Sequence, residues 1–281
     1  MRLDYFLPSP WAQAALTMHA VVEGIAEPRT EILPAMLPNL FVRLDGHSRV
    51  ALDGGPFIDA PPVTLLGPTC GAYRLMLSAG CRLLTIGLLP GGWARCLPMP
   101  AHECVDTLVD GAALWGETAT AEIIERLQAA PLNGAHVGLI ERFLMHGPRR
   151  ASHPGMLRLA GIDAWLERSP ALSLDTLCTQ LDVSARQLRR ITLEGYGMSP
   201  KTLAMKYRAL RLASSLSLAR ELPPTNPWQA EYADQSHMIR DFRRFIGWTP
   251  QAFRLEQRNV AAATLIGRHQ AGAIRPLALL S

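Results

Sequence analysis

Two segments near the C-terminus of this chain match each other at a constant offset of 50 residues. The first, SARQLRRITLEGYGMSPKTL, begins at Ser184, and the second, DQSHMIRDFRRFIGWTPQAF, begins at Asp234. Glycine and proline occupy equivalent positions in both segments, at Gly197 and Pro200 and again 50 residues later. An internal repeat of this kind predicts one structural unit that is built twice.

Each copy predicts a capped helix, a glycine stop and a second capped helix. Ser184 is a good N-cap, and Gln187 stands three residues later, where its amide completes a capping box. Gly197 suits the left-handed conformation that closes a helix, and proline suits the first position of the next one. Asp234 and Gly247 take the same places in the second copy.

The faces of these two helices differ sharply in character. Helical spacing predicts buried positions at Leu188, Ile191, Tyr196, Met238, Phe242, Phe245 and Ile246. It leaves outward-facing Ala185, Arg186, Gln187, Arg189, Arg190, Gln235, Ser236, Arg240, Arg243 and Arg244. Arginine and glutamine match the edges of guanine and adenine in the major groove, and arginine also neutralises phosphate. The alternative is a solvated arginine-rich face, but its occurrence on equivalent positions favours DNA binding.

The first copy also has the upstream helix that a helix-turn-helix unit requires. Ser173 caps a short run of residues, and Asp182 lies at the turn that leads into Ser184. The leucines that share one face of this run are Leu174, Leu177 and Leu181. The segments LSLDTLCTQLDVSARQLRR, GMSPKTL and YADQSHMIRDFRRFIGWTPQAFR together resemble the DNA-binding region of AraC/XylS-type bacterial transcription regulators, over roughly residues 156 to 256.

This resemblance implies two helix-turn-helix units joined by one long helix, with both recognition helices entering successive major grooves on one face of double-stranded DNA. The residues expected to approach base edges are Arg186, Gln187, Arg190, Gln235, Ser236, His237 and Arg240. Those expected to hold phosphates are Arg189, Lys201, Arg243 and Arg244. Ser184 and Ala185 open the first recognition helix and belong to the same predicted surface.

Charge is distributed unevenly along the 281 residues. Residues 1–155 carry 11 Arg and no Lys against 14 Asp and Glu, a balance of −3, whereas residues 156–281 carry 17 basic and 10 acidic residues, a balance of +7. The basic half coincides with the repeat, as nucleic-acid binding requires. We predict a sensing domain at 1–150, a linker at 147–155, a DNA-binding domain at 155–258 and a tail at 259–281.

Short apolar runs broken by Gly and Pro predict an α+β chain whose first half is a cupin-like barrel or sheet. The runs are LFVRLDG, VTLLG, AYRLMLSAG and RLLTIGLLPGG. The segment GLLPGGW, predicted as a turn and strand exit, resembles the sensory region on one branch of the same regulators, which implies a small-molecule effector.

Two helices follow in the sequence, one starting near Thr118 and one ending at Gly147. Their apolar positions are Ile123, Ile124, Leu127, Val137, Ile140, Phe143 and Leu144. The resemblance implies homodimerisation through them; covering their own sheet is the alternative.

The second copy departs from the family pattern just before its recognition helix. Pro223, Pro224 and Pro227 interrupt the support helix, and Glu231 stands where a glycine is expected. We expect a short support helix capped by Asn226; if this helix is looser than usual, the second recognition helix binds mainly phosphate and the first carries most of the sequence specificity. The linking helix, Pro200 to about Arg220, is predicted to place some of its cations on phosphate. These cations are Lys201, Lys206, Arg208 and Arg211.

The tail beyond Asn259 lacks caps and periodicity and is predicted to be poorly ordered or loosely docked.

The sequence gives little support to other functional classes, such as exported proteins, membrane proteins or enzymes. No export signal or membrane-length apolar run is present, and the five cysteines are scattered, which predicts a cytoplasmic protein with reduced thiols. No catalytic motif occurs, so we predict no enzymatic activity, no cofactor and no metal; His102-Glu103-Cys104 is the one cluster worth checking. The rival hypotheses are a barrel-type enzyme with a DNA-binding module, and a regulator that acts through protein contacts. An activator would also contact RNA polymerase.

Overall fold

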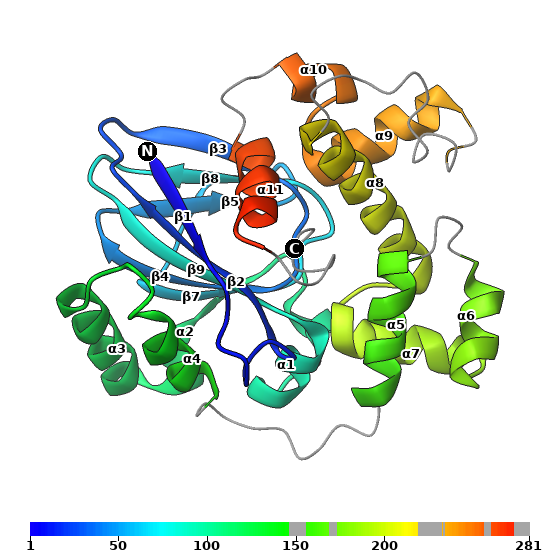
Figure 1. Ribbon diagram of the computed structural model, residues 1–281, viewed down its shortest axis with the longest axis horizontal. Helices are drawn as coiled ribbons and strands as arrows, with labels where there is room; N and C mark the ends of the chain where they lie inside the picture. Colours follow the sequence, from blue (N-terminus) through cyan, green and yellow to red (C-terminus); the bar gives the residue numbers. More distant parts are fainter. Residues whose placement is uncertain (146–155, 169–172, 219–231, 233, 256–259, 273–281) are drawn as a thin grey trace.

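The N-terminal half consists of two antiparallel sheets packed face to face (Figure 1). The computed structural model describes residues 1–145, 156–168, 173–218, 232, 234–255 and 260–272. The six-stranded sheet has the order β1 (Arg2–Phe6), β2 (Leu16–Glu23), β9 (Arg82–Leu88), β4 (Asn39–Asp45), β7 (Val63–Leu66) and β10 (Leu108–Asp110). The four-stranded sheet has the order β3 (Arg29–Leu33), β8 (Tyr73–Leu77), β5 (Ser48–Ala51) and β6 (Ile58–Asp59).

The central strands β2, β9, β4 and β7 of the six-stranded sheet are largely buried on both faces, which explains why they are mostly apolar. Its inner face packs against the smaller sheet, with Phe41 and Leu83 meeting Tyr73 and Leu75 in one cluster. Its outer face is covered by α1 (Pro90–Cys96), α3 (Glu117–Ala129) and α4 (Val137–Met145), while α2 (Gly111–Trp115) lies beside α3. The four strands expected from the apolar runs are all present, and the two helices cover their own sheet.

The segment GLLPGGW corrects one sequence-based expectation. It forms the end of β9 and then the helix α1, rather than a turn and strand exit. Pro90 occupies the first turn of α1, where its missing N–H costs nothing and its fixed φ favours the helix. The ring of Trp93 is buried, and its indole nitrogen donates to the carbonyl of Met99 at 2.8 Å. The segment therefore seals the sheet instead of forming a lip.

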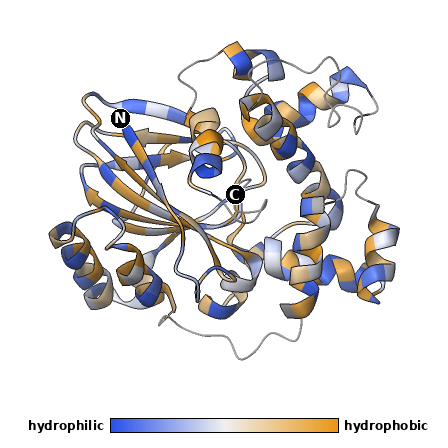
Figure 2. Cartoon of the chain, viewed as in Figure 1, coloured by the Kyte–Doolittle hydropathy of each residue, from blue (hydrophilic) through white to orange (hydrophobic). Residues whose placement is uncertain are grey.

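The C-terminal half is helical within the described residues, and its helices alternate hydrophobic and hydrophilic positions (Figure 2). The helices are α5 (Met156–Arg168), α6 (Leu174–Leu181), α7 (Ala185–Tyr196), α8 (Pro200–Leu218), α9 (Gln235–Ile246), α10 (Pro250–Leu255) and α11 (Val260–Gln270). Their apolar faces form one cluster that extends into the N-terminal half through Ala35, Leu37, Leu89 and Ala94. The predicted linker and the proline-rich support helix lie outside the described residues.

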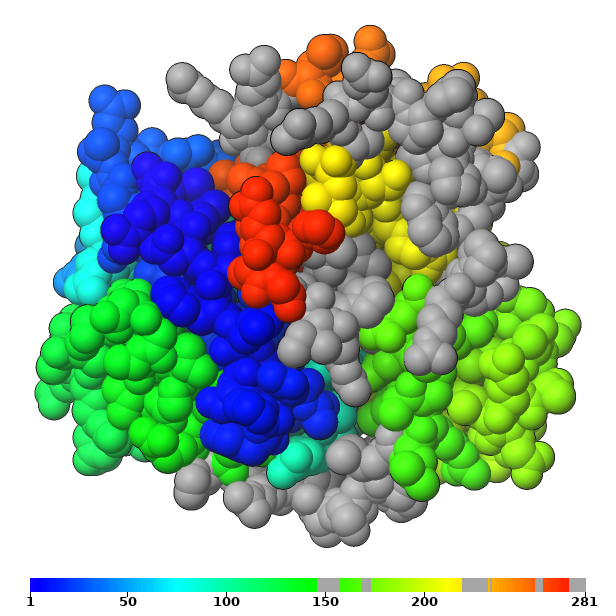
Figure 3. Space-filling view, viewed as in Figure 1, coloured from blue at the N-terminus to red at the C-terminus, as the bar shows by residue number. Residues whose placement is uncertain are grey.

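Helix α11 corrects the expectation of a loosely docked tail. Its residues Ala261, Leu265 and Arg268 are buried, and the helix packs against β1, β3 and α8. The space-filling view shows α11 (red) lying between the N-terminal strands (blue) and α8 (yellow) (Figure 3). The buried positions recur at helical spacing, and Asn259, immediately before Val260 in the sequence, is a residue type favoured at an N-cap, a start signal that the sequence-based expectation did not use. The tail thus returns to the sensing half and covers part of it.

Candidate nucleic-acid interface

The first helix-turn-helix unit consists of α6 and α7, and both begin at the predicted caps. The Ser173 side chain accepts from the backbone N–H of Thr176, and Asp182 at the end of α6 is left-handed, with φ of 49°. At the start of α7 the Ser184 hydroxyl accepts from the N–H of Gln187, whose side-chain oxygen accepts from the N–H of Ser184 at 2.8 Å. The complete capping box fixes the direction in which α7 leaves the turn.

The second recognition helix, α9, repeats this design with one difference at its start. The Asp234 carboxylate accepts from the backbone N–H of His237 at 2.7 Å, without a reciprocal bond from the third residue of the helix. Gly247 ends α9 in the left-handed conformation, with φ of 85°, as Gly197 ends α7 at 77°. The predicted caps and glycine stops of both copies are therefore confirmed.

The polar faces of α7 and α9 lie open to solvent along their N-terminal parts. The residues fully exposed on α7 or at its cap are Ser184, Ala185, Arg186, Gln187, Arg189 and Arg190, and those on or beside α9 are Gln235, Ser236, Arg240, Arg243 and Arg244. All seven predicted core positions of the two helices are buried. None of the exposed arginines forms an ion pair with another described residue. Their assignment to bases or phosphates remains a prediction.

His237 is the exception among the predicted base contacts, because protein groups already engage its ring. Its Nε2 lies 3.5 Å from a carboxylate oxygen of Asp241, and the ring packs edge-on against Tyr232 at 5.7 Å between centroids. Asp241 also accepts from the guanidinium of Arg208 at 2.8 Å. The base contact predicted for His237 would therefore have to be made by a half-buried side chain.

The cations of α8 correct a third expectation, since the fold removes three of the four from the DNA-binding surface. Lys201 is exposed, whereas Lys206 and Arg211 are buried and Arg208 is paired with Asp241. Lys206 donates from Nζ to the carbonyls of Met36 at 2.6 Å and of Thr69 at 3.1 Å. Arg211 donates to the carbonyl of Leu166, at the end of α5. These three cations hold the helical half together and attach it to the sheets.

Burial lowers the pKa of Lys206 to about 8, despite the favourable nearby charges of Cys70 and Asp106. Asp106 is itself a half-buried acid, and desolvation raises its pKa even though its carboxylate accepts from the Cys70 N–H at 2.9 Å. The lysine thus lies in a desolvated cleft between α8 and two loops of the sheet domain. The family resemblance did not predict this contact. In the sequence, Lys206 looks like an ordinary solvent-exposed lysine on a helix.

Both recognition helices end on the sheet domain. The backbone N–H of Ala35 donates to the carbonyl of Phe245 at 2.6 Å, and that of Ala72 donates to the carbonyl of Arg244 at 2.8 Å. The last turn of any helix leaves its carbonyls unpaired, so these two bonds satisfy acceptors of α9. The end of α7 packs on the short 3₁₀ helix at Ala101–Cys104. Within the described residues, the opposite, N-terminal ends of both helices make no hydrogen bond to the sheet domain.

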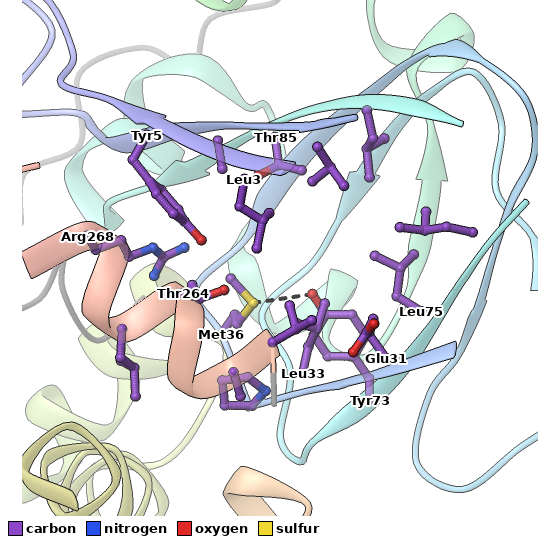
Figure 4. A pocket seen from close by; sticks show the side chains of 18 of the residues that line it. Leu3, Tyr5, Glu31, Leu33, Met36, Tyr73, Leu75, Thr85, Thr264 and Arg268 are labelled. Atoms are coloured by element: carbon purple, nitrogen blue, oxygen red, sulfur yellow. Dashed lines mark hydrogen bonds between the residues drawn. The ribbon is translucent and has the colours of Figure 1, made fainter. Parts of the chain in front are cut away.

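A second site lies inside the sheet domain, and sequence reasoning did not find it. An open cavity there is bordered by both sheets and by α8 and α11. Its polar groups are Tyr5, Glu31, Tyr73, Thr85, Thr264 and Arg268, set in a wall that is otherwise mainly aliphatic (Figure 4). The helical period of α11 is the only sequence signal for it, because the other lining residues look like ordinary strand core.

A metal site, a reactive thiol and a membrane span each have structural requirements that can be checked against the described part of the chain. No group of three or more His, Cys, Asp or Glu there could hold a metal ion. His102 and Glu103 are exposed while Cys104 is buried, so these neighbours do not converge. All five cysteines are free, and burial raises the pKa of Cys70, Cys81 and Cys104. No described helix is long and apolar enough to cross a membrane.

Comparison with known proteins agrees with this geometry. A family model described as a helix-turn-helix domain matches residues 177–256. No curated protein matches the chain by sequence. A 1.65 Å structure of ToxT from Vibrio cholerae is similar, with 12% identity, a TM-score of 0.50, and coverage of 86% of this chain and 98% of that one. ToxT of Vibrio cholerae strain SCE256 with a bound unsaturated fatty acid also matches, with 12% identity, a TM-score of 0.50, and coverage of 88% and 97%. The chain therefore carries a C-terminal helix-turn-helix domain, joined to a strand-rich N-terminal domain in the fold of ToxT.

Proposed function

We propose that this chain is a sequence-specific, DNA-binding transcription regulator that responds to a small-molecule effector held in its N-terminal domain. One observation carries the proposal. Two recognition helices of the same capped design present arginines that no described carboxylate neutralises, and both keep their N-terminal ends free of the sheet domain. Forked, unpaired guanidinium groups on such helices suit guanine edges and phosphate oxygens.

The cavity supports the effector part of this proposal. It lies within the sheet domain, and α8 and α11 of the helical half complete its wall. A ligand there would contact both halves at once, which is how a bound molecule acquires different affinities for two arrangements of a protein. ToxT, which shares the fold, has been crystallised with an unsaturated fatty acid bound. We place the effector site of this chain in the cavity.

The test is fluorescence-anisotropy binding to the duplex upstream of the chain's own coding region and to a scrambled duplex, across a salt series. A steep salt slope with clear preference for the native duplex is expected. Equal and weak binding to both duplexes would contradict the proposal and favour a regulator that acts through protein contacts.

Two substitutions separate the roles of individual arginines. Arg190→Ala should reduce binding to the native duplex by about 5- to 100-fold, with little effect on the scrambled duplex. Arg244→Ala should weaken both complexes alike and reduce the salt slope by about 1. Arg126→Ala, which removes an exposed arginine of α3 far from the helix-turn-helix units, is the matched control. Equal losses on both duplexes for Arg190→Ala would refute its assignment to a base.

A further inference from the structure

The cavity in the sheet domain has a polar end and an otherwise apolar wall. Its wall is formed mainly by aliphatic and aromatic side chains from both sheets, including Leu3, Val22, Phe41 and Leu75. At one end the guanidinium of Arg268 and the hydroxyl of Tyr5 face each other, with Thr264 beside them, while Glu31 lies apart, near Tyr73 (Figure 4). A ligand that fits this space needs one polar group and a slender apolar part.

Arg268 is the unusual member of the wall, because it is a buried cation without a counter-ion. Its side chain is only 4% exposed, its Nε has no hydrogen-bond partner, and it forms no ion pair with any described residue. Its nearest ionisable neighbours are Tyr5 and Tyr73, and burial raises the pKa of both phenols, so both are neutral near pH 7. A desolvated and unneutralised charge is costly, and an anion placed beside it would remove most of that cost.

Glu31, the only carboxylate in the wall, does not serve as this anion. Its carboxylate pairs with the guanidinium of Arg29, its own neighbour on β3. The ionisable groups that act electrostatically on Arg268 are the phenols of Tyr5 and Tyr73, and Glu31 is not among them. The cavity therefore offers one unpaired cation to a ligand, and the described residues of the wall supply no competing acid.

We propose that the cavity binds a slender apolar carboxylic acid whose carboxylate pairs with Arg268 of α11 and whose hydrocarbon body lies between the two sheets. This inference rests on the proposed function in one respect, namely that the acid acts as the effector. Guanidinium pairs with carboxylate through two parallel hydrogen bonds, which orients the acid as well as attracting it. The apolar wall contributes affinity in proportion to the hydrocarbon area that it removes from water.

Because Arg268 belongs to α11, a ligand that binds Arg268 would act directly on this helix. Helix α11 contacts β1 and β3 on one side and α8, the helix between the two DNA-binding units, on the other. An acid held by Arg268 would favour the docked position of α11 over any other. The ligand would thus act on the DNA-binding half through a helix that follows it in the sequence.

The test compares decanoate with decanol, two probes of equal chain length that differ in charge, by isothermal titration calorimetry on the full chain. Decanoate should bind at least tenfold more tightly than decanol. Arg268→Met should abolish this preference while retaining decanol binding, Arg268→Lys should keep part of it, and Arg126→Met should behave as wild type. Equal affinity of the wild-type chain for both probes, or no binding of either, would overturn the proposal even if Arg268→Met fails to fold.

Hydrogen exchange locates the site independently of affinity. Decanoate should slow exchange of backbone amides in β1, β3 and α11 of the wild-type chain, and protection confined to other elements would refute the assignment. Duplex binding without decanoate separates the two proposals. A chain that prefers its native duplex but shows no preference for decanoate overturns only the ligand inference. A chain that binds decanoate through Arg268 but shows no preference for the native duplex overturns only the regulator proposal.

Discussion

The two helix-turn-helix units match in sequence but differ in how they are attached to the sheet domain. The first unit ends in packing contacts, with Gly197 against Pro68 and Val105. The second unit ends in hydrogen bonds, because the carbonyls of Arg244 and Phe245 accept from amides of the sheet domain. A repeated sequence therefore need not give repeated connections, since the connections depend on what the other domain presents.

The difference matters because the amides that hold the second unit lie beside residues that line the cavity. Ala35 lies between Pro34 and Met36, and Ala72 precedes Tyr73; all three of these neighbours line the cavity. A ligand that shifts these segments would move hydrogen-bond donors of α9 directly. We expect an effector to change the position of the second unit more than that of the first.

The largest effects should come from matched core positions in the two units. Leu188→Ala and Met238→Ala remove buried side chains at equivalent places in the repeat, and each should lower the free energy of unfolding by about 2–5 kcal/mol. Leu188→Ala should also abolish the preference for the native duplex, whereas Met238→Ala should weaken binding to native and scrambled duplexes alike. Thermal unfolding and anisotropy measure both. Loss of preference in Met238→Ala would show that the second unit also reads sequence.

Lys206 gives a smaller effect that depends on pH. Because its pKa falls from 10.5 to about 8 on folding, the folded chain releases this proton first as pH rises. The lysine should therefore contribute about 2 kcal/mol more to stability at pH 9.5 than at pH 7.5. Lys206→Met should remove that contribution from the pH dependence measured by denaturant unfolding. Because cysteines and tyrosines also titrate in this range, the quantity to compare is the difference between wild type and variant; identical pH profiles would contradict the assignment.

The glycine stops should reveal how each unit touches the sheet domain. A Cβ on Gly247 would lie 2.4 Å from Cγ2 of Ile32, and one on Gly197 would lie 2.6 Å from Cγ of Pro68. Each change to alanine should cost about 1–2 kcal/mol from the left-handed backbone alone, and the contacts add to it. Gly247→Ala should also alter decanoate affinity, because Ile32 belongs to β3 beside the cavity. Equal decanoate affinities in the two variants would remove the distinction between the units.

The helix caps should produce the smallest differences. Ser184→Ala and Asp234→Ala should each cost about 1 kcal/mol, and the loss should be larger for Ser184 because its capping box is complete. Gln187→Ala tests the reciprocal half of the box alone. A greater loss for Asp234→Ala, measured by thermal unfolding, would mean that the second unit depends more on its own cap than on the sheet domain.

Sequence reasoning predicted the features that depend on short-range geometry. The caps at Ser184 and Asp234, the stops at Gly197 and Gly247, and the buried faces of both recognition helices all follow from spacing of 3 to 4 residues. The four strands with clear apolar runs were predicted for the same reason. The strands β1, β3, β5, β6 and β10 are short or polar, and β2 contains the buried polar residues Thr17 and His19, so none of these six stood out.

Features that depend on contacts between distant segments were not predictable. Lys206 and Arg211 look like solvated helix cations, and only the sheet domain and α5 bury them. Arg268 looks like a tail residue, and its burial requires α11 to cross to the strands. A single sequence states which side chains are polar, but it does not state which polar side chains the rest of the chain will cover.

The 19 residues of α8 have a consequence for how the two units are oriented about the helix axis. At about 100° and 1.5 Å per residue, the helix sets the angular phase between α7 and α9 as well as a separation of about 28 Å. Inserting one residue in α8 would turn one unit by roughly a quarter of a revolution relative to the other, away from the face of the duplex that both must share. Only insertions close to whole turns would preserve the phase, so the length of this helix is restricted more tightly than its composition.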